Sequence, residues 1–281
     1  MQIHWYPGHM AKTRRMIKDH LSLVDVILEL TDARAPFTTH LPDLKQLIGS
    51  KELIVVLNKA DLADEKVTEL WIDRFAELGI KAMDVDAITR RGLSKLVSEI
   101  KKFSPNNLRR PTRCMVLGVT NVGKSSIINQ LAGRKGAKTG NKPGVTRGKM
   151  WLKVDQKLEL LDTPGILWPK FEKKSIGIKL ALLGSIKDEL LDFEKLALLF
   201  IRFLKEKYPL CLSSRYKVNF DDNTPVAILE ELSKNRGFLL SGGVPDIQRG
   251  AITLINEFRL GKLGKISLES PEDDEGIWQE M

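Results

Sequence analysis

Residues 118–125 read GVTNVGKS and match the pattern G-x-x-x-x-G-K-[ST]. A short apolar run precedes them at residues 114–117, and a helical pattern continues to about Leu131. At a strand-to-helix junction of this kind, glycines let the backbone wrap around a phosphate with its N–H groups pointing inward, and the helix N-terminus adds positive potential. Because chance gives such a match in about one per cent of chains this long, the stretch predicts a phosphate-binding loop.

The side chains of this loop have distinct expected roles toward a nucleoside triphosphate. Lys124 is expected to reach the β- and γ-phosphates, and the Ser125 hydroxyl is expected to bind Mg²⁺. The other candidate nucleotide contacts of the loop are Asn121, Val122, Gly123 and Ser126.

Two further segments fit a triphosphate bound at this loop. The sequence DTPG at residues 162–165 begins 44 positions after Gly118 and follows an apolar run. An acid at the end of a buried strand can hold Mg²⁺ through water, so Asp162 is a candidate metal ligand, and the Gly165 N–H is a candidate γ-phosphate contact. Thr146, in the glycine-rich loop between the two motifs, is the candidate second hydroxyl ligand of Mg²⁺. A flexible basic loop would have the same composition.

NKAD at residues 58–61 indicates which base is bound. The Asp61 carboxylate can accept hydrogen bonds from the N1 and N2 donors of guanine, whereas adenine would leave a buried charge unpaired. Asn58 is expected to support N7, and the aliphatic part of Lys59 is expected to cover the ring. The backbone N–H of Ala87 is the candidate contact for O6. NKAD alone also fits an ordinary turn before a helix, but beside the other motifs it predicts GTP rather than ATP.

Hydrophobic patterning predicts the fold class. Apolar runs at 24–30, 53–57, 80–85 and 114–117 alternate with helical patterns at 41–48, 65–78 and 93–103, and two more strands are expected near 150–154 and 158–161. This alternation is typical of an α/β domain with a mainly parallel sheet flanked by helices. Beyond about Ser175 helical periodicity predominates, with helices expected to begin at Thr224-Pro225 and at Asp246.

These patterns divide the chain into four expected parts. They are an N-terminal segment at 1–20, a nucleotide-binding GTPase domain at 21–175, a small all-helical C-terminal domain at 176–268 and an acidic tail at 269–281.

The order of the motifs is unusual for a GTPase. NKAD and Ala87 precede the phosphate-binding loop, whereas in most GTPases the guanine-specific motif comes last. We interpret the domain as circularly permuted, which a parallel α/β sheet tolerates because old termini can be joined and a surface loop opened. DTPG therefore leads directly into the helical region, and we hypothesise that loss of the γ-phosphate moves that region.

Composition excludes several protein classes and favours one kind of partner. With 42% apolar and 29% charged residues among 281, the chain is neither mostly disordered nor collagen-like. No uncharged apolar run approaches the roughly 18 residues of a membrane span. The net charge is +9, and six acids lie beyond residue 268, so residues 1–268 hold 45 basic and 30 acidic residues, a charge of +15. A basic body favours a nucleic-acid partner, although a soluble protein with a positive surface looks the same.

The two cysteines and the N-terminus indicate the compartment. Cys114 and Cys211 form no CxxC or Cys/His cluster, so buried, reduced thiols of a cytosolic protein are expected rather than a zinc site. The N-terminus lacks the apolar core of a secretory signal. We expect a mature cytoplasmic protein.

Three other stretches carry a family resemblance. HWYPGHM at 4–10, DARAP at 32–36 and FRLGKLG at 258–264, with the permuted motif order, closely resemble the ribosome biogenesis GTPase A (YlqF/RbgA) family over nearly the whole chain except the acidic tail. The resemblance implies a bacterial GTPase that binds a late precursor of the large (50S) ribosomal subunit, promotes its last maturation steps and leaves on GTP hydrolysis. Separately, we expect the protein to be a monomer. It also implies that the helical domain contacts ribosomal RNA.

The resemblance gives two residues candidate roles in hydrolysis. Ile166 follows DTPG, where many GTPases carry a water-orienting glutamine, so the N-terminal histidine of the family, His9 rather than His4, is the candidate catalytic residue. A role of His9 in fixing the N-terminal segment stays open. Asn121 matches the asparagine of potassium-dependent GTPases, in which K⁺ supplies the positive charge of an arginine finger. A loop-stabilising role for Asn121 also stays open.

The partner of the helical domain is the least determined feature. Candidate RNA contacts are Arg236, Arg249, Arg259, Lys262 and Lys265, since phosphate binding needs cationic side chains on a structured surface. Two other functions fit the same residues: a GTPase switch whose helical domain recruits a protein without binding RNA, and an RNA-binding protein that keeps nucleotide as a structural ligand. Steep loss of particle binding with salt would favour phosphate contacts over a protein interface.

Overall fold

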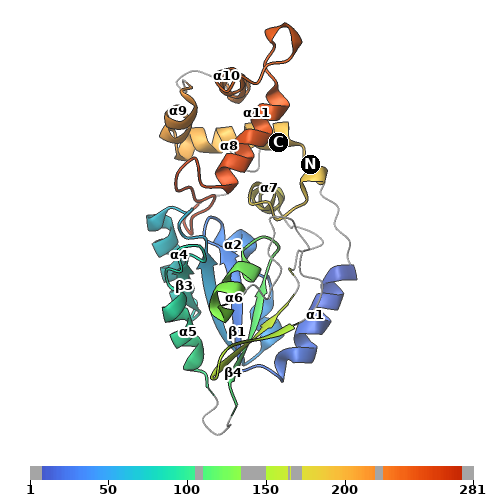
Figure 1. The fold of residues 1–281 in the computed structure, drawn as a ribbon, viewed down its shortest axis with the longest axis vertical. Coiled ribbons are helices and arrows are strands. Elements are labelled where there is room, and N and C mark those ends of the chain that lie inside the picture. The colour runs from blue at the N-terminus through green and yellow to red at the C-terminus, as the bar shows by residue number, and fades with distance from the viewer. Residues whose placement is uncertain are drawn as a thin grey trace. The chain divides into compact units, whose positions relative to one another are not determined.

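The computed structural model describes residues 8–104, 110–133, 150–163, 165, 173–218 and 224–273, with backbone only for residues 8–13 and 150. The chain forms two compact units (Figure 1). The first comprises Met1–Glu172 together with Ser267–Glu272, and the second comprises Lys173–Ile266 together with Asp273–Met281.

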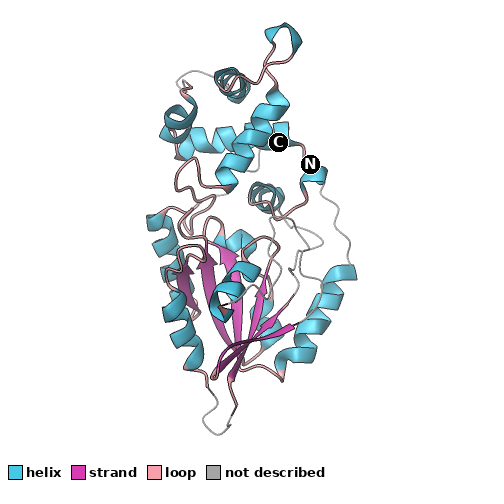
Figure 2. Ribbon diagram, viewed as in Figure 1, coloured by secondary structure: helices cyan, strands magenta, loops and turns pink. Residues whose placement is uncertain are grey.

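The first unit is built on a six-stranded sheet with the strand order β3-β2-β1-β4-β6-β5. Its strands are β1 (Val26–Asp32), β2 (Glu52–Asn58), β3 (Lys81–Val85), β4 (Thr112–Gly118), β5 (Met150–Asp155) and β6 (Leu158–Asp162). All pairings are parallel except that of β5 with β6, and Figure 2 shows the sheet surrounded by helices. The predicted class, a mainly parallel sheet flanked by helices and followed by a helical region, is confirmed.

The register of the sheet brings three functional strand ends to one edge. Asp32 at the end of β1 lies opposite Asn58 at the end of β2, and Leu30 lies opposite Gly118 at the end of β4. The chain runs from β1 to β2 and β3 on one side, and β4 lies on the other side of β1. In open α/β sheets, ligands bind beyond the carboxyl ends of the strands at such a reversal.

The helices of the first unit are α1 (Gly8–Leu21), α2 (Pro36–Thr39), α3 (Leu44–Ile48), α4 (Glu65–Glu77), α5 (Leu93–Lys101) and α6 (Lys124–Ala132). The helical pattern expected at 41–48 is shorter in the structure: Asp43 has a left-handed backbone conformation (φ +58°), and α3 begins only at Leu44. Helix α4 begins at an N-cap, Asp64, whose carboxylate accepts hydrogen bonds from two backbone N–H groups of its first turn.

The second unit is helical. Its elements are α7 (Lys174–Leu182), η1 (Asp188–Leu190), α8 (Phe193–Lys207), α9 (Leu210–Tyr216), α10 (Pro225–Asn235), η2 (Ser241–Gly243) and α11 (Ile247–Arg259). Thr224 caps α10 through its side chain, as the sequence predicts, and Asp246, the expected start of the last helix, is the N-cap of α11. Helices α8, α10 and α11 pack around buried aromatic residues, with the ring centroids of Phe200 and Phe258 4.7 Å apart.

The expected boundary between a helical domain ending at 268 and an acidic tail beginning at 269 differs from the structure. Residues Ser267–Glu272, here called the clasp, belong to the first unit. Glu269 is only 4% exposed because its carboxylate accepts hydrogen bonds from the backbone N–H and hydroxyl of Thr38. A carboxylate that accepts two hydrogen bonds is stable in a buried position, whereas the acidic composition of the segment predicts a solvated tail.

None of the helices in the described part of the chain has the length and apolarity needed to cross a membrane.

Candidate functional site

The phosphate-binding loop requires glycine at two positions. A Cβ on Gly118 would lie 2.4 Å from the carbonyl oxygen of Leu30, and one on Gly123 would lie 2.3 Å from Asn58 Nδ2. Gly123 also has a φ of +93°, a conformation that glycine adopts without strain. The loop therefore lies closely against β1 and against the end of β2.

Lys124 lies inside this loop. Its ammonium donates to the carbonyl oxygens of Gly118 and Val119, both at 2.9 Å, and the residue is 7% exposed. Burial lowers the pKa of Lys124 to about 8, although the nearby Asp162 opposes the shift. The loop carbonyls thus orient the ammonium group in the place where the pattern predicts a contact with phosphate.

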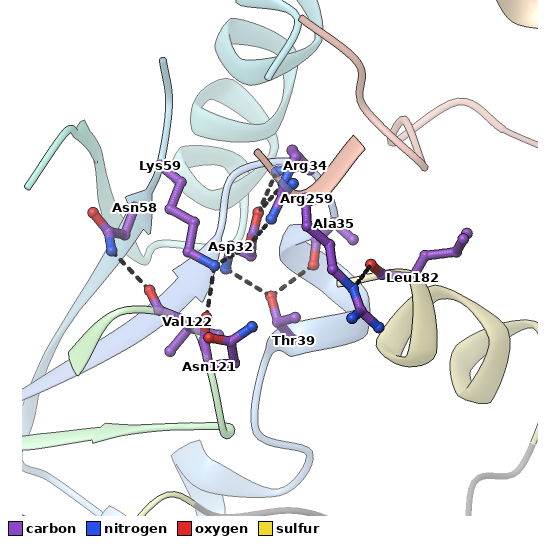
Figure 3. Close-up of polar contacts among 10 residues, drawn as sticks. All are labelled: Asp32, Arg34, Ala35, Thr39, Asn58, Lys59, Asn121, Val122, Leu182 and Arg259. Carbon is purple, nitrogen blue, oxygen red and sulfur yellow. Dashed lines mark hydrogen bonds and ion pairs between the residues drawn. The ribbon is translucent and has the colours of Figure 1, made fainter. Parts of the chain in front are cut away.

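The NKAD segment is bonded directly to the phosphate-binding loop. Asn58 Nδ2 donates to Val122 O at 2.7 Å, and Lys59 Nζ donates to Asn121 O at 2.6 Å (Figure 3). Hydrogen bonds between residues 64 and 62 positions apart in the chain therefore join the two segments. This contact also fixes the aliphatic stem of Lys59, which the sequence predicts to cover the base.

Asp61 presents a carboxylate oxygen that lacks a protein partner. Its Oδ1 atom is buried, and the described residues give it no hydrogen-bond donor. Burial raises the pKa of Asp61, and the neighbouring Asp86 carboxylate raises it further. Because buried polar atoms in native proteins nearly always have a partner, an orphaned acceptor here fits a ligand that carries N–H donors.

The Ala87 loop is shaped by the acid that precedes it. Asp86 accepts hydrogen bonds from the Ile88 N–H at 2.7 Å, from the Thr89 N–H at 3.2 Å and from the Thr89 hydroxyl. Ala87 itself is 5% exposed, and the described residues offer its N–H no acceptor. The loop can therefore donate one backbone N–H to a bound base.

The DTPG segment lies against the phosphate-binding loop. A Cβ on Gly165 would lie 2.9 Å from Thr120 Cγ2 and 3.2 Å from Lys124 Nζ. Asp162 is buried, and its Oδ1 has no partner among the described residues. Burial raises the pKa of Asp162 to about 6, with Lys124 opposing the shift. Asp162 interacts electrostatically with Lys124, the first residue of α6, and a buried carboxylate oxygen suits a hard cation such as Mg²⁺.

Two of the expected site residues, Thr146 and His9, cannot be compared with the structure. Thr146 and Ile166 lie outside the described residues, and so does His4. The backbone of His9 is in the first turn of α1, but its side chain is outside the description. Of the P-loop candidates, Ser126 lies in the first turn of α6 and is partly buried.

Comparisons with known proteins agree with this geometry. Residues 113–216 match a family model described as "50S ribosome-binding GTPase". The chain is 42% identical over 282 residues to ribosome biogenesis GTPase A of Bacillus cereus, covering 97% of this chain and 95% of the relative. It is 36% identical to the protein of the same name from Thermotoga maritima, covering 99% and 98%.

The chain belongs to the ribosome biogenesis GTPase A family. Among solved structures it is similar to a GDP-bound TM YlqF (TM-score 0.68, 31% identity, 92% of this chain and 100% of that chain). It is also similar to GNP-bound YlqF from T. maritima (TM-score 0.67, 32% identity, 94% and 100%). As a member of this GTPase family, the chain hydrolyses GTP, and GTP and GDP are its substrate and product.

The family model begins at Arg113, the second residue of β4. The strands β1 and β2, with the guanine-specific NKAD after β2, therefore precede the matched region in the chain. This is the permuted order that the motifs indicate.

The site contains a buried ion pair to which the sequence analysis gave no role. Arg34 donates through Nε and Nη2 to the two carboxylate oxygens of Asp32, at 2.9 and 2.8 Å, and each residue is 1% exposed. Lys59 Nζ lies 3.0 Å from Asp32 Oδ2 (Figure 3). Burial alone would raise the pKa of Asp32, but Arg34 and Lys59 hold it well below its usual range. The sequence signal that could have indicated this ion pair is an acidic residue at the end of a buried strand, followed two positions later by an arginine.

Two candidate RNA contacts are engaged within the second unit. Arg236 donates to Glu257 at 2.6 Å, and its guanidinium lies 5.0 Å from the ring centroid of Tyr216. Arg259 donates to the carbonyl oxygens of Ala181 and Leu182. These arginines stabilise the helical packing, whereas Lys262 and Lys265 are exposed and Arg249 is exposed beside Phe238.

Proposed function

We propose that this GTPase binds precursors of the large (50S) ribosomal subunit, promotes their late maturation and is released when GTP is hydrolysed. Full-length similarity to proteins named for ribosome biogenesis supports the proposal, as does a family model described as ribosome-binding. The charge of +15 over residues 1–268 suits ribosomal RNA, because phosphate neutralisation dominates affinity for nucleic acids. The protein acts as a cytoplasmic monomer.

Guanine recognition is the part of the proposal with the most direct structural support. Asp61 accepts from N1 and N2 of the base, the Ala87 N–H donates to O6, and Asn58 supports N7 while Lys59 covers the ring. The single observation that carries this assignment is the buried Oδ1 of Asp61, which has no donor among the described residues and lies in a segment bonded to the phosphate-binding loop. The loop residues Asn121, Val122, Gly123, Lys124, Ser125 and Ser126 hold the phosphates, with Gly165 at the γ-phosphate.

Two cations complete the proposed site. Ser125, Thr146 and Asp162 hold Mg²⁺, which supplies neutralisation of the charge on the phosphate oxygens. The buried Asp162 Oδ1, for which the described part of the chain offers no hydrogen-bond partner, supports this assignment. Asn121 holds K⁺, and the ribosomal particle and K⁺ both stimulate hydrolysis. His9 orients the attacking water, since Ile166 cannot donate or accept a hydrogen bond.

Sedimentation and turnover together test the proposed partner. The full chain is expected to co-sediment with large-subunit precursors in the presence of a non-hydrolysable GTP analogue and to dissociate with GDP. Turnover should rise when these particles are added. Binding that weakens steeply with salt indicates phosphate contacts, whereas salt-insensitive binding indicates the alternative, a protein partner of the helical domain. Slow turnover that no ribosomal particle accelerates contradicts the proposal.

Two changes test the hydrolytic roles separately. His9→Ala is expected to retain GTP affinity and to lose stimulated hydrolysis, and equal turnover would remove His9 from catalysis. Replacing K⁺ by Na⁺ is expected to slow hydrolysis in the wild-type protein, and an unchanged rate would remove the K⁺ site at Asn121.

A further inference from the structure

The clasp is bonded to the segments that follow β1 and β2. The Leu268 N–H donates to Arg34 O at 2.6 Å, and the Asp64 N–H, just beyond NKAD, donates to Ser267 Oγ at 3.1 Å. The Glu269 carboxylate accepts from the N–H and hydroxyl of Thr38 at 2.9 and 2.6 Å.

One more contact involves the backbone of the clasp. The indole Nε1 of Trp71, on α4, donates to the carbonyl oxygen of Glu269 at 3.2 Å. Ser267, Leu268 and Glu269 are all buried. A segment from the far end of the chain thus ties the α2 region to the start of α4.

From Arg34 a continuous set of polar contacts leads to the phosphate-binding loop. The Arg34 guanidinium holds both oxygens of Asp32, Asp32 faces the Lys59 ammonium, and Lys59 donates to Asn121 O. Figure 3 shows Asp32 between Arg34 and Lys59. Because Asp32 is the anionic partner of Lys59, its position sets where the Lys59 stem lies.

We propose that the clasp is a positioning element of the guanine site, which holds Arg34 and Asp32 in place and thereby keeps Lys59 over the base and bonded to the phosphate-binding loop. Loosening the clasp speeds the release of guanine nucleotide. This inference rests on nucleotide binding by the first unit and is independent of the proposed ribosomal partner.

The connections between the two units allow the clasp to take part in regulation. The chain enters the second unit at Lys173, eight positions after the last residue of DTPG, leaves it at Ile266, immediately before the clasp, and returns to it at Asp273. The second unit is therefore covalently joined at one end to the γ-phosphate motif and at the other to the support of the guanine site. A partner that pulls on the second unit can alter GTP hydrolysis through one connection and GDP release through the other.

The test measures dissociation of a fluorescent GDP analogue from the full-length protein after a chase with unlabelled GDP. Glu269→Ala removes the acceptor of two charge-assisted hydrogen bonds and is expected to raise the dissociation rate about tenfold. Thr38→Val removes only one of these hydrogen bonds and is expected to raise the rate about threefold. Glu272→Ala is the matched control, because it removes the same charge from an exposed position of the clasp.

A double-mutant cycle shows whether the clasp acts through Lys59. In a Lys59→Met background, Glu269→Ala is expected to change the rate by less than about twofold, because the contact that it supports is already gone. Melting of the nucleotide-free variants reports structural damage separately.

Three results would overturn the inference. The first is an unchanged GDP dissociation rate in Glu269→Ala, and the second is an equal change of that rate in Glu269→Ala and Glu272→Ala. The third is a double variant whose fold-change in dissociation rate equals the product of the fold-changes of Glu269→Ala and Lys59→Met. If Glu269→Ala does not fold, the same comparisons are made with Thr38→Val, for which an unchanged rate is equally decisive.

Discussion

Replacing Asp61 by asparagine should change which base the site prefers. Guanine presents two adjacent donors, N1–H and N2–H, to the carboxylate. An asparagine amide keeps one acceptor and turns its NH₂ group toward a second donor. Xanthine carries an oxygen in place of the 2-amino group, so the same amide can accept from N1–H and donate to that oxygen.

The size of the change follows from the burial of Asp61 Oδ1. Losing one hydrogen bond to a charged acceptor and creating a donor–donor contact costs about 3 kcal/mol, or about a hundredfold in the Kd for GDP. The Kd for xanthosine diphosphate should fall by a similar factor. Because burial and Asp86 raise the pKa of Asp61, the folded apo-protein carries an unfavourable charge at this position. Asp61→Asn should therefore melt no lower than wild type without nucleotide.

Calorimetric titration of both proteins with GDP, xanthosine diphosphate and ADP measures these constants. The control is ADP, which both proteins should bind weakly. If Asp61→Asn binds GDP as tightly as wild type, Asp61 does not contact the base and the guanine assignment is wrong. Weaker binding of GDP without a gain for xanthosine diphosphate would place Asp61 near the base without the paired geometry.

Three further changes test other parts of the structure. Gly123→Ala should weaken GDP binding more than tenfold by calorimetry, because the added Cβ would lie 2.3 Å from Asn58 Nδ2. Gly133→Ala is the control and should leave GDP binding unchanged, because Gly133 also has a positive φ but no described atom lies within 4 Å of its Cβ position. Gly250→Ala should lower the free energy of unfolding, measured by denaturant titration, by about 1–3 kcal/mol, because the added Cβ would lie 2.1 Å from Ser233 Oγ. Adding Ser233→Ala to this variant should restore part of the lost free energy of unfolding, because it removes the clashing hydroxyl. Hydrogen bonds from Arg215 and Tyr216 and the charge of Arg236 lower the pKa of Glu257 from 4.5 to about 2. After solvent screening, this carboxylate is expected to stabilise the fold by about 1–3 kcal/mol above pH 4.5, and the contribution is lost as pH falls toward 2. Glu257→Gln should remove that acid-dependent loss from the urea unfolding of the protein.

Each grouped prediction has a result that would contradict it. Equal GDP affinities of Gly123→Ala and Gly133→Ala would mean that crowding at Asn58 is unimportant. An unchanged denaturant midpoint for Gly250→Ala would mean that α10 and α11 accommodate the added methyl group with no loss of stability. The same pH dependence between 4.5 and 2 in wild type and Glu257→Gln would assign the acid sensitivity to other groups.

The strands and the nucleotide motifs could be predicted because each depends on local sequence. Residues 114–117 are uniformly apolar since β4 is buried on both faces, and the glycines of the following loop are required by close backbone contacts. Capping residues such as Thr224 and Asp246 likewise act within one helical turn. Signals of this range are visible in a single sequence.

The Asp32–Arg34 pair and the clasp could not be predicted because their partners are distant in the chain. Glu269 lies 231 positions from Thr38, and its sequence neighbours are acidic and polar, which favours a solvated tail. Arg236 and Arg259 resembled free cations for the same reason, since the carboxylate and carbonyl groups that hold them come from other helices. Pairings between remote segments leave no periodicity in the sequence.

The discontinuous first unit has a consequence for biosynthesis. Translation completes the sheet and both nucleotide loops long before residues 267–272 are made, and the whole second unit is made in between. A nascent chain interrupted anywhere before the clasp therefore leaves Trp71, Thr38 and the backbone carbonyl of Arg34 without their final partners. The buried contacts of the first unit are therefore completed only after synthesis has passed the second unit.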